Sequence, residues 1–583
     1  MNANVDACFA LLGRLKSLGI THCVISPGGR STPLAYVANQ LFEASVVIDE
    51  RDAGFVALGL SASTGVAPIV ITTSGSAPSH LYPAICEAFN SNLGIIVLSA
   101  DHPHIERAAG GDQTINQVDL FGTHVRYSFD TKLASDISDK SYWFEISDNI
   151  FKTVSSDNIN CGPAQLNIAF NKVLTPDGDE SYSPGSFDII SEEAPEDSER
   201  DVGTILKNIC IEIESIPNGV ITLGRNHYMD ISKIQNLSNI LDWPIFADGN
   251  SNARYIDGVI TSYDFMSRQN NFDEIAPSYV LQFGEPLISS TWTKRINSYK
   301  MNVTAFKKFD DGRDPNLNIS KSIINNDINF CLDVLIDTLN KNSTGFKNKV
   351  LAFQDDARNK IEILLSTNVN SEPNLFSEIG KILGGTSTSH ENTRVANSEK
   401  RSHPNQSGEP LLNILLGNSM PVRYAERLWT YINSNTRVFS NRGTNGIDGS
   451  LSTATGIAIG SNSQTLAVLG DVTFAHDLGF LPHANKFAIK NDLNIIFVVI
   501  DNAGGAIFSH LPQSTNEYMK DLYNEIVKTD PEIDFNSVAK SFKCRTGHDL
   551  NDLKSALSSN NPGVDVIILK TEHYSGRDIM PLV

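Results

Sequence analysis

The chain has 583 residues, a formal net charge of -21, and 40% hydrophobic and 19% charged residues. The length suffices for about three or four domains, and this balance is typical of a soluble globular protein rather than a disordered one. The acidic surplus argues against a nucleic-acid partner, because binding a phosphate backbone requires a basic face. It leaves room for small anionic substrates in a locally positive cleft.

The cysteine pattern and the N-terminus indicate the compartment. Seven cysteines are scattered without a C-x-x-C pair, which is typical of a reducing environment. The first 20 residues predict an amphipathic helix, because Arg14 and Lys16 interrupt an apolar run too short for a secretion signal. No segment approaches the length of a membrane span. We therefore expect a cytoplasmic protein without membrane insertion.

The first region, residues 1–180, predicts a parallel α/β sheet. Five apolar runs, HCVISP, ASVVIDE, APIVITTSG, LGIIVLSA and AQLNIAF, alternate with helical patterns. An acidic, Ser- and Pro-rich stretch, 181–201, follows as a linker.

Polar residues follow several of these strands. ISPGGRSTPLA predicts a strand, a glycine turn and a helix whose start attracts anions, with Arg30 offering a fork for a carboxylate. Glu50, where a strand meets a helix, has two interpretations: a surface carboxylate favoured by the helix dipole, or a buried one that holds or passes a proton. Ser74 lacks the G-x-S-x-G context of a hydrolase nucleophile. His102 and His104 lack the further ligands of a zinc site.

The middle region, 202–340, contains the strands GVITLG, PIFAD and YVLQFG and no obvious charged constellation, so we expect it to be mostly structural. A second linker is predicted over 341–409, where the polar insertion 384–409 is typical of a loop.

The third region, 410–583, contains the most informative pair of motifs. The apolar strands of LAVLGDVTFAHD and IIFVVIDNAGGAIF deliver Asp471 and, 31 residues later, Asn502 and then Gly504. A carboxylate, an amide and a carbonyl oxygen at the carboxyl ends of parallel strands suit Mg²⁺ with a diphosphate. The alternative is that these are ordinary turn residues.

Two further motifs in this region carry arginines. GNSMPVR places Ser419 and Arg423 one helical turn apart, and Arg442 follows the next strand; ordinary solvated arginines are the alternative. The first and third regions also share an order of strand, polar turn, small-residue helix and strand, which would let two related domains share one ligand unless the similarity is chance.

Eight segments together resemble the thiamine-diphosphate enzymes, and among them the 2-succinyl-5-enolpyruvyl-6-hydroxy-3-cyclohexene-1-carboxylate synthase family of menaquinone biosynthesis. The resemblance covers nearly the whole chain and implies three parallel-sheet α/β domains: pyrimidine-binding (1–180), middle (202–340) and diphosphate-binding (410–583). It also implies a homodimer or dimer of dimers. The segments are ISPGGRSTPLA, DERDAGFVALGL, TSGSAPSHLYPA, GGDQTINQVDLFG, GNSMPVR, SNRGTNGIDGSLSTATG, GDVTFAHDLG and DNAGGAIFSHLPQ.

The resemblance implies decarboxylation of 2-oxoglutarate on thiamine diphosphate with Mg²⁺, or Mn²⁺ as an alternative, and 1,4-addition of the succinyl unit to isochorismate. Glu50 of one subunit would hydrogen-bond the aminopyrimidine of the cofactor held by the other subunit. The implied cofactor residues are Glu50, Pro27, Gly417, Ser419, Asp471, Asn502, Ile507 and Phe508. The implied metal ligands are Asp471, Asn502 and Gly504, and the implied substrate residues are Arg30, His102, Gln113, Lys294, Ser419, Arg423 and Arg442.

The acceptor side departs from the family pattern. Gly29 replaces a usual serine and His102 a usual arginine, and an arginine-to-histidine change removes a permanent charge and a fork of donors. A paralogue with the same donor and another acceptor therefore stays open. A protein that keeps the fold without the chemistry is disfavoured by Glu50, Asp471 and Asn502, and an acetohydroxyacid synthase by the carboxylate-binding arginines. His80 and Asp501, each where the family tends to asparagine, are further departures.

Overall fold

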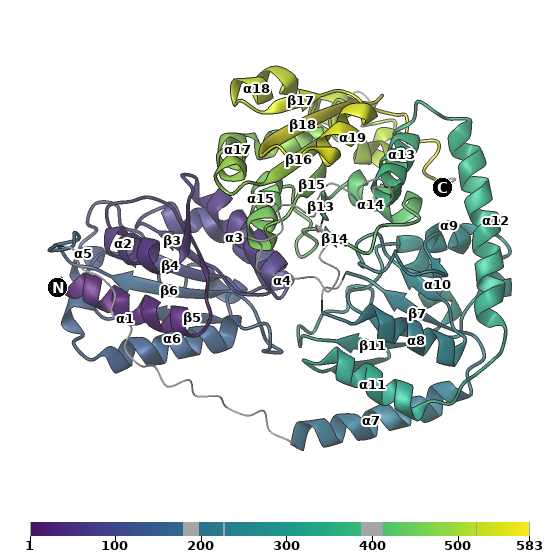
Figure 1. Cartoon of the computed structure of the whole chain (residues 1–583), viewed down its shortest axis with the longest axis horizontal. Helices are drawn as coiled ribbons and strands as arrows, with labels where there is room; N and C mark the ends of the chain where they lie inside the picture. The colour runs from purple at the N-terminus through teal and green to yellow at the C-terminus, as the bar shows by residue number, and fades with distance from the viewer. Residues whose placement is uncertain (1, 179–196, 226–227, 386–411, 520–521, 582–583) are drawn as a thin grey trace.

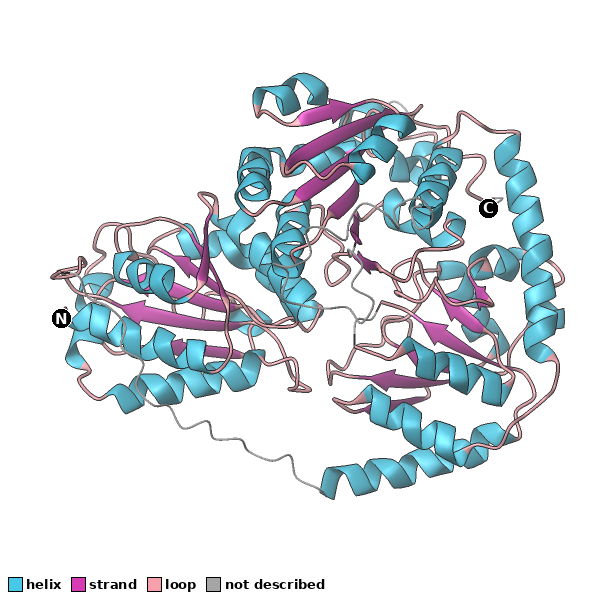
Figure 2. Ribbon diagram, in the orientation of Figure 1, coloured by secondary structure: helices cyan, strands magenta, loops and turns pink. Residues whose placement is uncertain are grey.

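The computed structural model describes residues 2–178, 197–225, 228–385, 412–519 and 522–581. In this part of the chain, three six-stranded parallel sheets with flanking helices form three domains (Figures 1 and 2). The predicted fold class is confirmed. Strands such as β16 are buried along nearly their whole length, which explains their continuous apolar sequences.

The first sheet has the strand order β2-β1-β3-β4-β6-β5. All five predicted strands form, and the sixth, β5, was missed because its residues are half-exposed and lack a long apolar run. The strands are β1 (His22–Ile25), β2 (Glu43–Val46), β3 (Ile69–Thr72), β4 (Ile96–Asp101), β5 (Tyr127–Asp130) and β6 (Ala164–Ala169). The helices are α1 (Ala3–Ser17), α2 (Thr32–Leu41), α3 (Glu50–Thr64), α4 (Tyr82–Asn90), α5 (His104–Ala108) and α6 (Lys140–Val154).

Helix α1 forms where the sequence predicts it, but it is buried on most of its surface rather than on one face. Arg14, one of the two basic residues that interrupt the apolar run, is buried and pairs with Asp148 of α6 at 2.7 Å. A partner on another helix, invisible in the local sequence, supplies the charge that makes this burial tolerable.

The middle sheet has a different order, β12-β11-β10-β7-β8-β9. Helix α7 begins inside the predicted linker 181–201, and most of that linker lies outside the described residues. The strands are β7 (Gly219–Leu223), β8 (Ile245–Ala247), β9 (Val259–Ile260), β10 (Tyr279–Phe283), β11 (Asn302–Lys307) and β12 (Lys321–Ile324). The helices are α7 (Asp197–Glu214), α8 (Ile231–Leu241), α9 (Tyr263–Arg268), α10 (Ser290–Tyr299) and α11 (Ile328–Thr338).

The second predicted linker, 341–409, is not an open connection over its described part. It forms two long helices, α12 (Phe346–Ser366) and α13 (Glu372–Gly385), and α12 runs along the outer side of the middle and third domains (Figure 1). Buried side chains at helical spacing, such as Val350, Ala357 and Ile361, join a core that includes the third sheet. Nearly all of the insertion 384–409 lies outside the described residues.

The third sheet has the order β14-β13-β15-β16-β18-β17, the same topology as the first sheet. The strands are β13 (Leu412–Leu416), β14 (Thr436–Phe439), β15 (Thr465–Gly470), β16 (Asn494–Asp501), β17 (Arg545–Gly547) and β18 (Gly563–Lys570). The helices are α14 (Met420–Leu428), α15 (Ser450–Ser461), α16 (Asp471–His476), α17 (Leu481–Lys490), α18 (Phe535–Ser541) and α19 (Leu550–Ser558).

The first and third domains meet where α3 crosses α15 (Figure 1). The crossing is close because each helix has a glycine at it: a Cβ on Gly59 would lie 2.1 Å from the Thr453 carbonyl oxygen, and one on Gly456 would lie 2.1 Å from the Val56 carbonyl oxygen. One continuous apolar core joins these two domains, and another joins the third domain to the middle one. Among the described residues we find no helix with the length and apolar character needed to cross a bilayer.

Candidate active site

The carboxyl edge of the third sheet brings together the residues of the predicted cation site. Asp471, the first residue of α16, is buried, and its Oδ2 accepts hydrogen bonds from the backbone N–H groups of Asn502 (3.2 Å) and Gly504 (2.8 Å). The two strands that deliver these residues, β15 and β16, are neighbours in the sheet. Residues 31 and 33 positions apart thus converge on one carboxylate, at the sheet edge where α/β ligands bind.

The electrostatics of this edge suit a cation. Burial raises the pKa of Asp471 to about 6, against the opposing effect of the backbone N–H donors. Among the described residues, no Lys, Arg or His forms an ion pair with Asp471. The side-chain oxygen of Asn502 is also buried and has no hydrogen-bond partner. A buried carboxylate without an ion-pair partner, beside an unsatisfied amide oxygen, fits a hard divalent cation, which binds such oxygen ligands.

Gly504 contacts Asp471 through its N–H group rather than its carbonyl. Its carbonyl oxygen accepts a hydrogen bond from the Ala506 N–H at 2.6 Å. Its φ of 112° lies in the region that favours glycine, and a Cβ there would lie 2.3 Å from the Lys528 carbonyl oxygen. Glycine is therefore required here by the backbone, whatever further role the carbonyl has.

Glu372 also reaches this edge, although sequence reasoning placed it in a linker. It is the first residue of α13 and is only 2% exposed. Its Oε2 accepts hydrogen bonds from Asn502 Nδ2 (3.0 Å) and Thr571 Oγ1 (3.3 Å). Burial raises the pKa of Glu372 to about 7, and the nearby Asp471 adds to the rise. The one local signal, a carboxylate next to a proline at a helix start, is too common to reveal this role.

A second cluster lies in the loops after β13 and β14, where the predicted donor-binding residues gather. Ser419 precedes α14 with φ 74° and ψ -128°, and the Arg423 guanidinium donates to the Ser419 carbonyl. Asn418 Oδ1 accepts from Arg442 Nη1 at 3.1 Å, which ties the two loops together. The sequence pattern quoted Asn418 only as a neighbour of Ser419, and its linking role was missed.

The two arginines of this cluster are partly buried cations, and the acidic groups that act on Arg442, which are Asp248 and Glu87, are not in ion-pair contact with it. Among the described residues, neither Arg423 nor Arg442 has a carboxylate oxygen within 4.0 Å. Burial, with the neighbouring Arg423 and Arg225 guanidinium groups, lowers the pKa of Arg442 to about 10, so Arg442 stays charged near neutral pH. Burial also lowers the pKa of Arg423. Two partly buried, unpaired guanidinium groups form a binding site for an anion, because each offers a fork of donors.

The predicted acceptor residues of the first domain form a third group. Arg30 donates to the Phe170 carbonyl at 2.9 Å and lies 3.9 Å from Glu106. His102 is buried, its Nδ1 has no hydrogen-bond partner, and burial together with Arg30 lowers the pKa of its imidazole. Gln113 Nε2 donates to the Ser74 carbonyl at 3.1 Å. Arg30 and His102 are therefore neighbours, and the histidine is neutral near pH 7.

The remaining predicted residues are more dispersed. Lys294 is exposed on α10 of the middle domain. Glu50 is half-exposed at the start of α3, and its neighbour Arg51 lies 3.6 Å from Asp477 of the third domain, so Glu50 lies near the boundary between these domains. Pro27 is exposed after β1, and Gly417 directly follows β13. Ile507 and Phe508 lie in the short helix Ala506–His510, the latter exposed.

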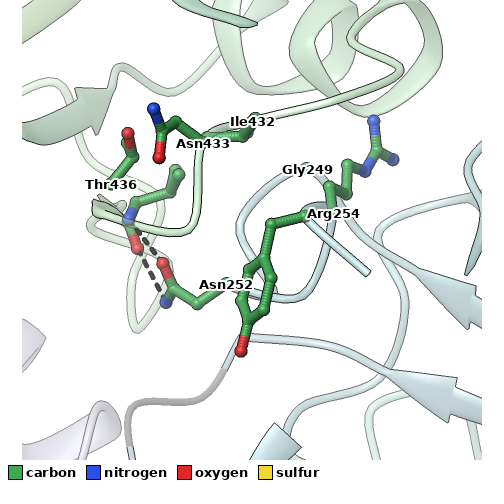
Figure 3. A pocket seen from close by; sticks show the side chains of 8 residues that line it. Gly249, Asn252, Arg254, Ile432, Asn433 and Thr436 are labelled. Carbon is green, nitrogen blue, oxygen red and sulfur yellow. Dashed lines mark hydrogen bonds between the residues drawn. The ribbon is translucent and has the colours of Figure 1, made fainter. Parts of the chain in front are cut away.

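A small pocket lies between the middle and third domains, and none of the predicted site residues lines it (Figure 3). Asn252 bridges the two domains there, accepting from the Val438 N–H (2.6 Å) and donating to the Val438 carbonyl (3.3 Å). Arg254 extends from the pocket to the end of α14, where it donates to the Ala425 carbonyl (3.0 Å) and pairs with Glu426 (3.0 Å). The middle domain thereby holds the helix that carries Arg423.

Comparison with known proteins agrees with this geometry. Residues 6–120 match the family model "Thiamine pyrophosphate enzyme, N-terminal TPP binding domain", and residues 420–564 match its C-terminal counterpart. Over 567 residues the chain is 30% identical to the 2-succinyl-5-enolpyruvyl-6-hydroxy-3-cyclohexene-1-carboxylate synthase of Staphylococcus epidermidis, covering 95% of this chain and 92% of that protein. The chain belongs to this synthase family. A relative from Lysinibacillus sphaericus with the same name is 29% identical over 558 residues, covering 92% of this chain and 89% of the relative.

Solved structures support the fold of this family member. The benzoylformate decarboxylase of Polynucleobacter necessarius matches with a TM-score of 0.65 and 13% identity, covering 97% of this chain and 98% of that one. At this identity the likeness shows the fold alone. The two matched domains identify the synthase-family chain as a thiamine-diphosphate-dependent enzyme that acts on small molecules.

Proposed function

We propose that this protein decarboxylates 2-oxoglutarate and transfers the succinyl unit to isochorismate by 1,4-addition, as a thiamine-diphosphate-dependent transferase. The observation that carries the donor half is the pair Arg423 and Arg442, two guanidinium groups with no carboxylate oxygen within 4.0 Å among the described residues. A dicarboxylic 2-oxoacid supplies the anionic oxygens that such a pair binds. The product in the relatives' names supports the acceptor half.

The cofactor would be held through a divalent cation at Asp471, Asn502 and Gly504, which we expect to be Mg²⁺ with Mn²⁺ as an alternative. The unpaired Asp471 carboxylate and the unsatisfied Asn502 oxygen support this assignment. When bound, thiamine diphosphate supplies the electron sink for loss of carbon dioxide. Apolar contacts from Ile507 and Phe508, with Pro27 and Gly417, would complete its site.

The chain's own residues would then orient the reactants and handle protons. Arg423 and Ser419 would hold the donor carboxylate, and Arg442 would stabilise negative charge in a partly buried site where electrostatic attraction is stronger than in water. Glu50 would hydrogen-bond the aminopyrimidine ring of the cofactor. This hydrogen bond would favour the imino tautomer of that ring.

For the acceptor, Arg30 would supply the positive charge. His102 would offer a neutral hydrogen bond beside it, because burial and Arg30 lower its pKa. Gln113 and Lys294 complete the proposed acceptor set.

We further propose a homodimer or dimer of dimers in which Glu50 of one subunit meets the cofactor of the other. Light scattering coupled to gel filtration tests this assembly. A monomer with full activity would contradict it.

The decisive experiment incubates the protein with 2-oxoglutarate, Mg²⁺ and thiamine diphosphate, with and without isochorismate. We expect carbon dioxide release from 2-oxoglutarate, and formation of the cyclohexene product only when isochorismate is also present. Failure of any 2-oxoglutarate turnover would overturn the donor assignment.

The second candidate is a paralogue with the same donor and a different acceptor. Gly29 and the neutral His102 favour it, because both reduce recognition of carboxylates beside Arg30. Donor consumption without conversion of isochorismate would select this candidate and reject the first.

A further inference from the structure

Glu372 is a buried carboxylate that the proposed reaction does not use. It comes from the helix that precedes the third sheet, yet its side chain lies at the carboxyl edge of that sheet beside Asn502 and Asp471. Among the described residues it forms no ion pair. A buried carboxylate without a counter-charge is costly unless something compensates for it.

The hydrogen bond from Asn502 to Glu372 determines how the amide is turned. Glu372 Oε2 accepts a hydrogen bond from the Thr571 hydroxyl and lies 3.0 Å from Asn502 Nδ2, so the Asn502 amide directs its NH₂ group toward Glu372. The amide oxygen then points elsewhere, and it is the buried atom that lacks a partner. The backbone N–H of the same residue donates to Asp471, so this free oxygen belongs to the residue that contacts the proposed metal-binding carboxylate.

We propose that Glu372 is a positioning residue for the divalent cation: it holds the Asn502 amide so that the buried amide oxygen is offered as a ligand. Thr571, whose hydroxyl donates to the same carboxylate oxygen, fixes Glu372 from the other side. The inference rests on the proposed cation site at Asp471 and Asn502. Outer residues of this kind typically change metal affinity by about 10- to 100-fold.

A purely structural role predicts a different behaviour. Glu372 begins α13, and its backbone N–H donates to Ser575 Oγ at 3.2 Å, so the residue also connects the helix to the C-terminal segment. If the side chain served only to hold the helix to this segment through Thr571, its substitution would lower the stability of the metal-free protein and leave metal affinity unchanged. A positioning role predicts weaker metal binding without loss of metal-free stability, because a glutamine can turn either its oxygen or its NH₂ group toward Asn502 and no longer fixes the amide.

The test compares Glu372→Gln with the wild type and with Glu378→Gln, a control on the same helix whose carboxylate pairs with Lys381 at the surface. Calorimetry with Mg²⁺ in the presence of thiamine diphosphate gives the metal Kd, and thermal unfolding without metal gives Tm. We expect Glu372→Gln to raise the Kd about 10- to 100-fold with an equal or higher metal-free Tm. Glu378→Gln should match the wild type. A lower metal-free Tm with an unchanged Kd would overturn the proposal.

A paired substitution separates orientation from stability. Asn502→Asp alone places a second carboxylate 3.0 Å from Glu372, so metal binding should weaken. When Asn502→Asp is combined with Glu372→Gln, the new side-chain NH₂ group at position 372 can donate to the new carboxylate at position 502. The double variant should therefore recover much of the affinity for Mg²⁺. Equal Kd values for the single and double variants would contradict the proposal. Absence of Mg²⁺-dependent cofactor binding in the wild type would instead reject the cation site itself.

Discussion

The first and third domains share one strand order and carry different chemistry at the same edge. Strand β4 ends at Asp101 and is followed by His102, whereas its counterpart β16 ends at Asp501 and is followed by Asn502. In the first domain, this position holds a neutral imidazole beside Arg30. In the third domain, it holds Asn502, whose backbone N–H donates to Asp471 and whose side-chain amide donates to Glu372. The topology decides where a ligand binds, and the loop residues decide which ligand.

The carboxyl edges of the first and third sheets also differ in how their charged residues are paired. In the first domain, Arg30 has Glu106 nearby as a counter-charge. In the third domain, Asp471 forms no ion pair among the described residues, and neither do Arg423 and Arg442, which lie in other segments. A site that leaves both signs unpaired is suited to a cation and an anion together. The third-domain edge therefore has the charges that the proposed metal diphosphate and carboxylate substrate would require.

The largest effect should come from removing the charge at the third-domain edge. Asp471→Asn keeps the side-chain shape and loses the only ionised ligand of the proposed set, so Mg²⁺ affinity should fall more than about 100-fold, beyond the effect of an outer residue. Calorimetry with Mg²⁺ and thiamine diphosphate measures it. Asp501→Asn, next to the same site, is the control, and its Mg²⁺ affinity should stay within a few-fold of the wild-type value. Similar losses of affinity in both variants would mean that only the net charge of the site matters.

Next in size is the loss of an unpaired arginine. Arg423→Met should lower kcat/KM for 2-oxoglutarate about 10- to 150-fold, because a hydrogen bond to a charged group contributes about 1.5–3 kcal/mol. Steady-state carbon dioxide release measures the loss. A 2-oxoacid without the distal carboxylate, 2-oxopentanoate, should be turned over equally by both enzymes, and an equal loss with both substrates would contradict carboxylate recognition by Arg423.

The crossing of α3 and α15 offers a symmetrical test of the two domains. Gly59→Ala and Gly456→Ala each place a Cβ 2.1 Å from a backbone oxygen of the other helix, so each should reduce the free energy of unfolding by about 1–3 kcal/mol. Denaturant unfolding measures both variants. Gly203→Ala in α7, where a Cβ meets nothing within 4 Å, should be neutral or stabilising. If only one of the crossing variants is destabilised, the helices do not meet as described.

The smallest effect should come from the first-domain edge. A Cβ on Gly29 meets nothing within 4 Å, so Gly29→Ser fits without strain and adds one hydroxyl near Arg30. If isochorismate is the acceptor, its KM should fall by a few-fold, in line with about 0.5–1.5 kcal/mol for one hydrogen bond. Initial rates at varied isochorismate concentration measure this. A KM that rises would favour the paralogue with another acceptor.

The sequence by itself determined the fold class and the main motifs, because their signals are local. A buried parallel strand must be apolar along its length, and polar residues directly after such strands must lie at one sheet edge. Asp471 and Asn502 could therefore be placed together from their spacing alone. Strands such as β5, half-exposed and short, carry no such signal and were missed.

Only the tertiary structure decided which side chains meet from distant parts of the chain. Glu372 lies 130 residues before Asn502 in a stretch predicted as a linker, and no local pattern announces a hydrogen bond over that distance. The hydrogen bond between Asn418 and Arg442 is likewise invisible in the local sequence. So is the exposed position of Lys294 on α10. Such contacts depend on how whole domains pack. The free energy that stabilises this packing comes from the burial of many residues together and not from any short motif.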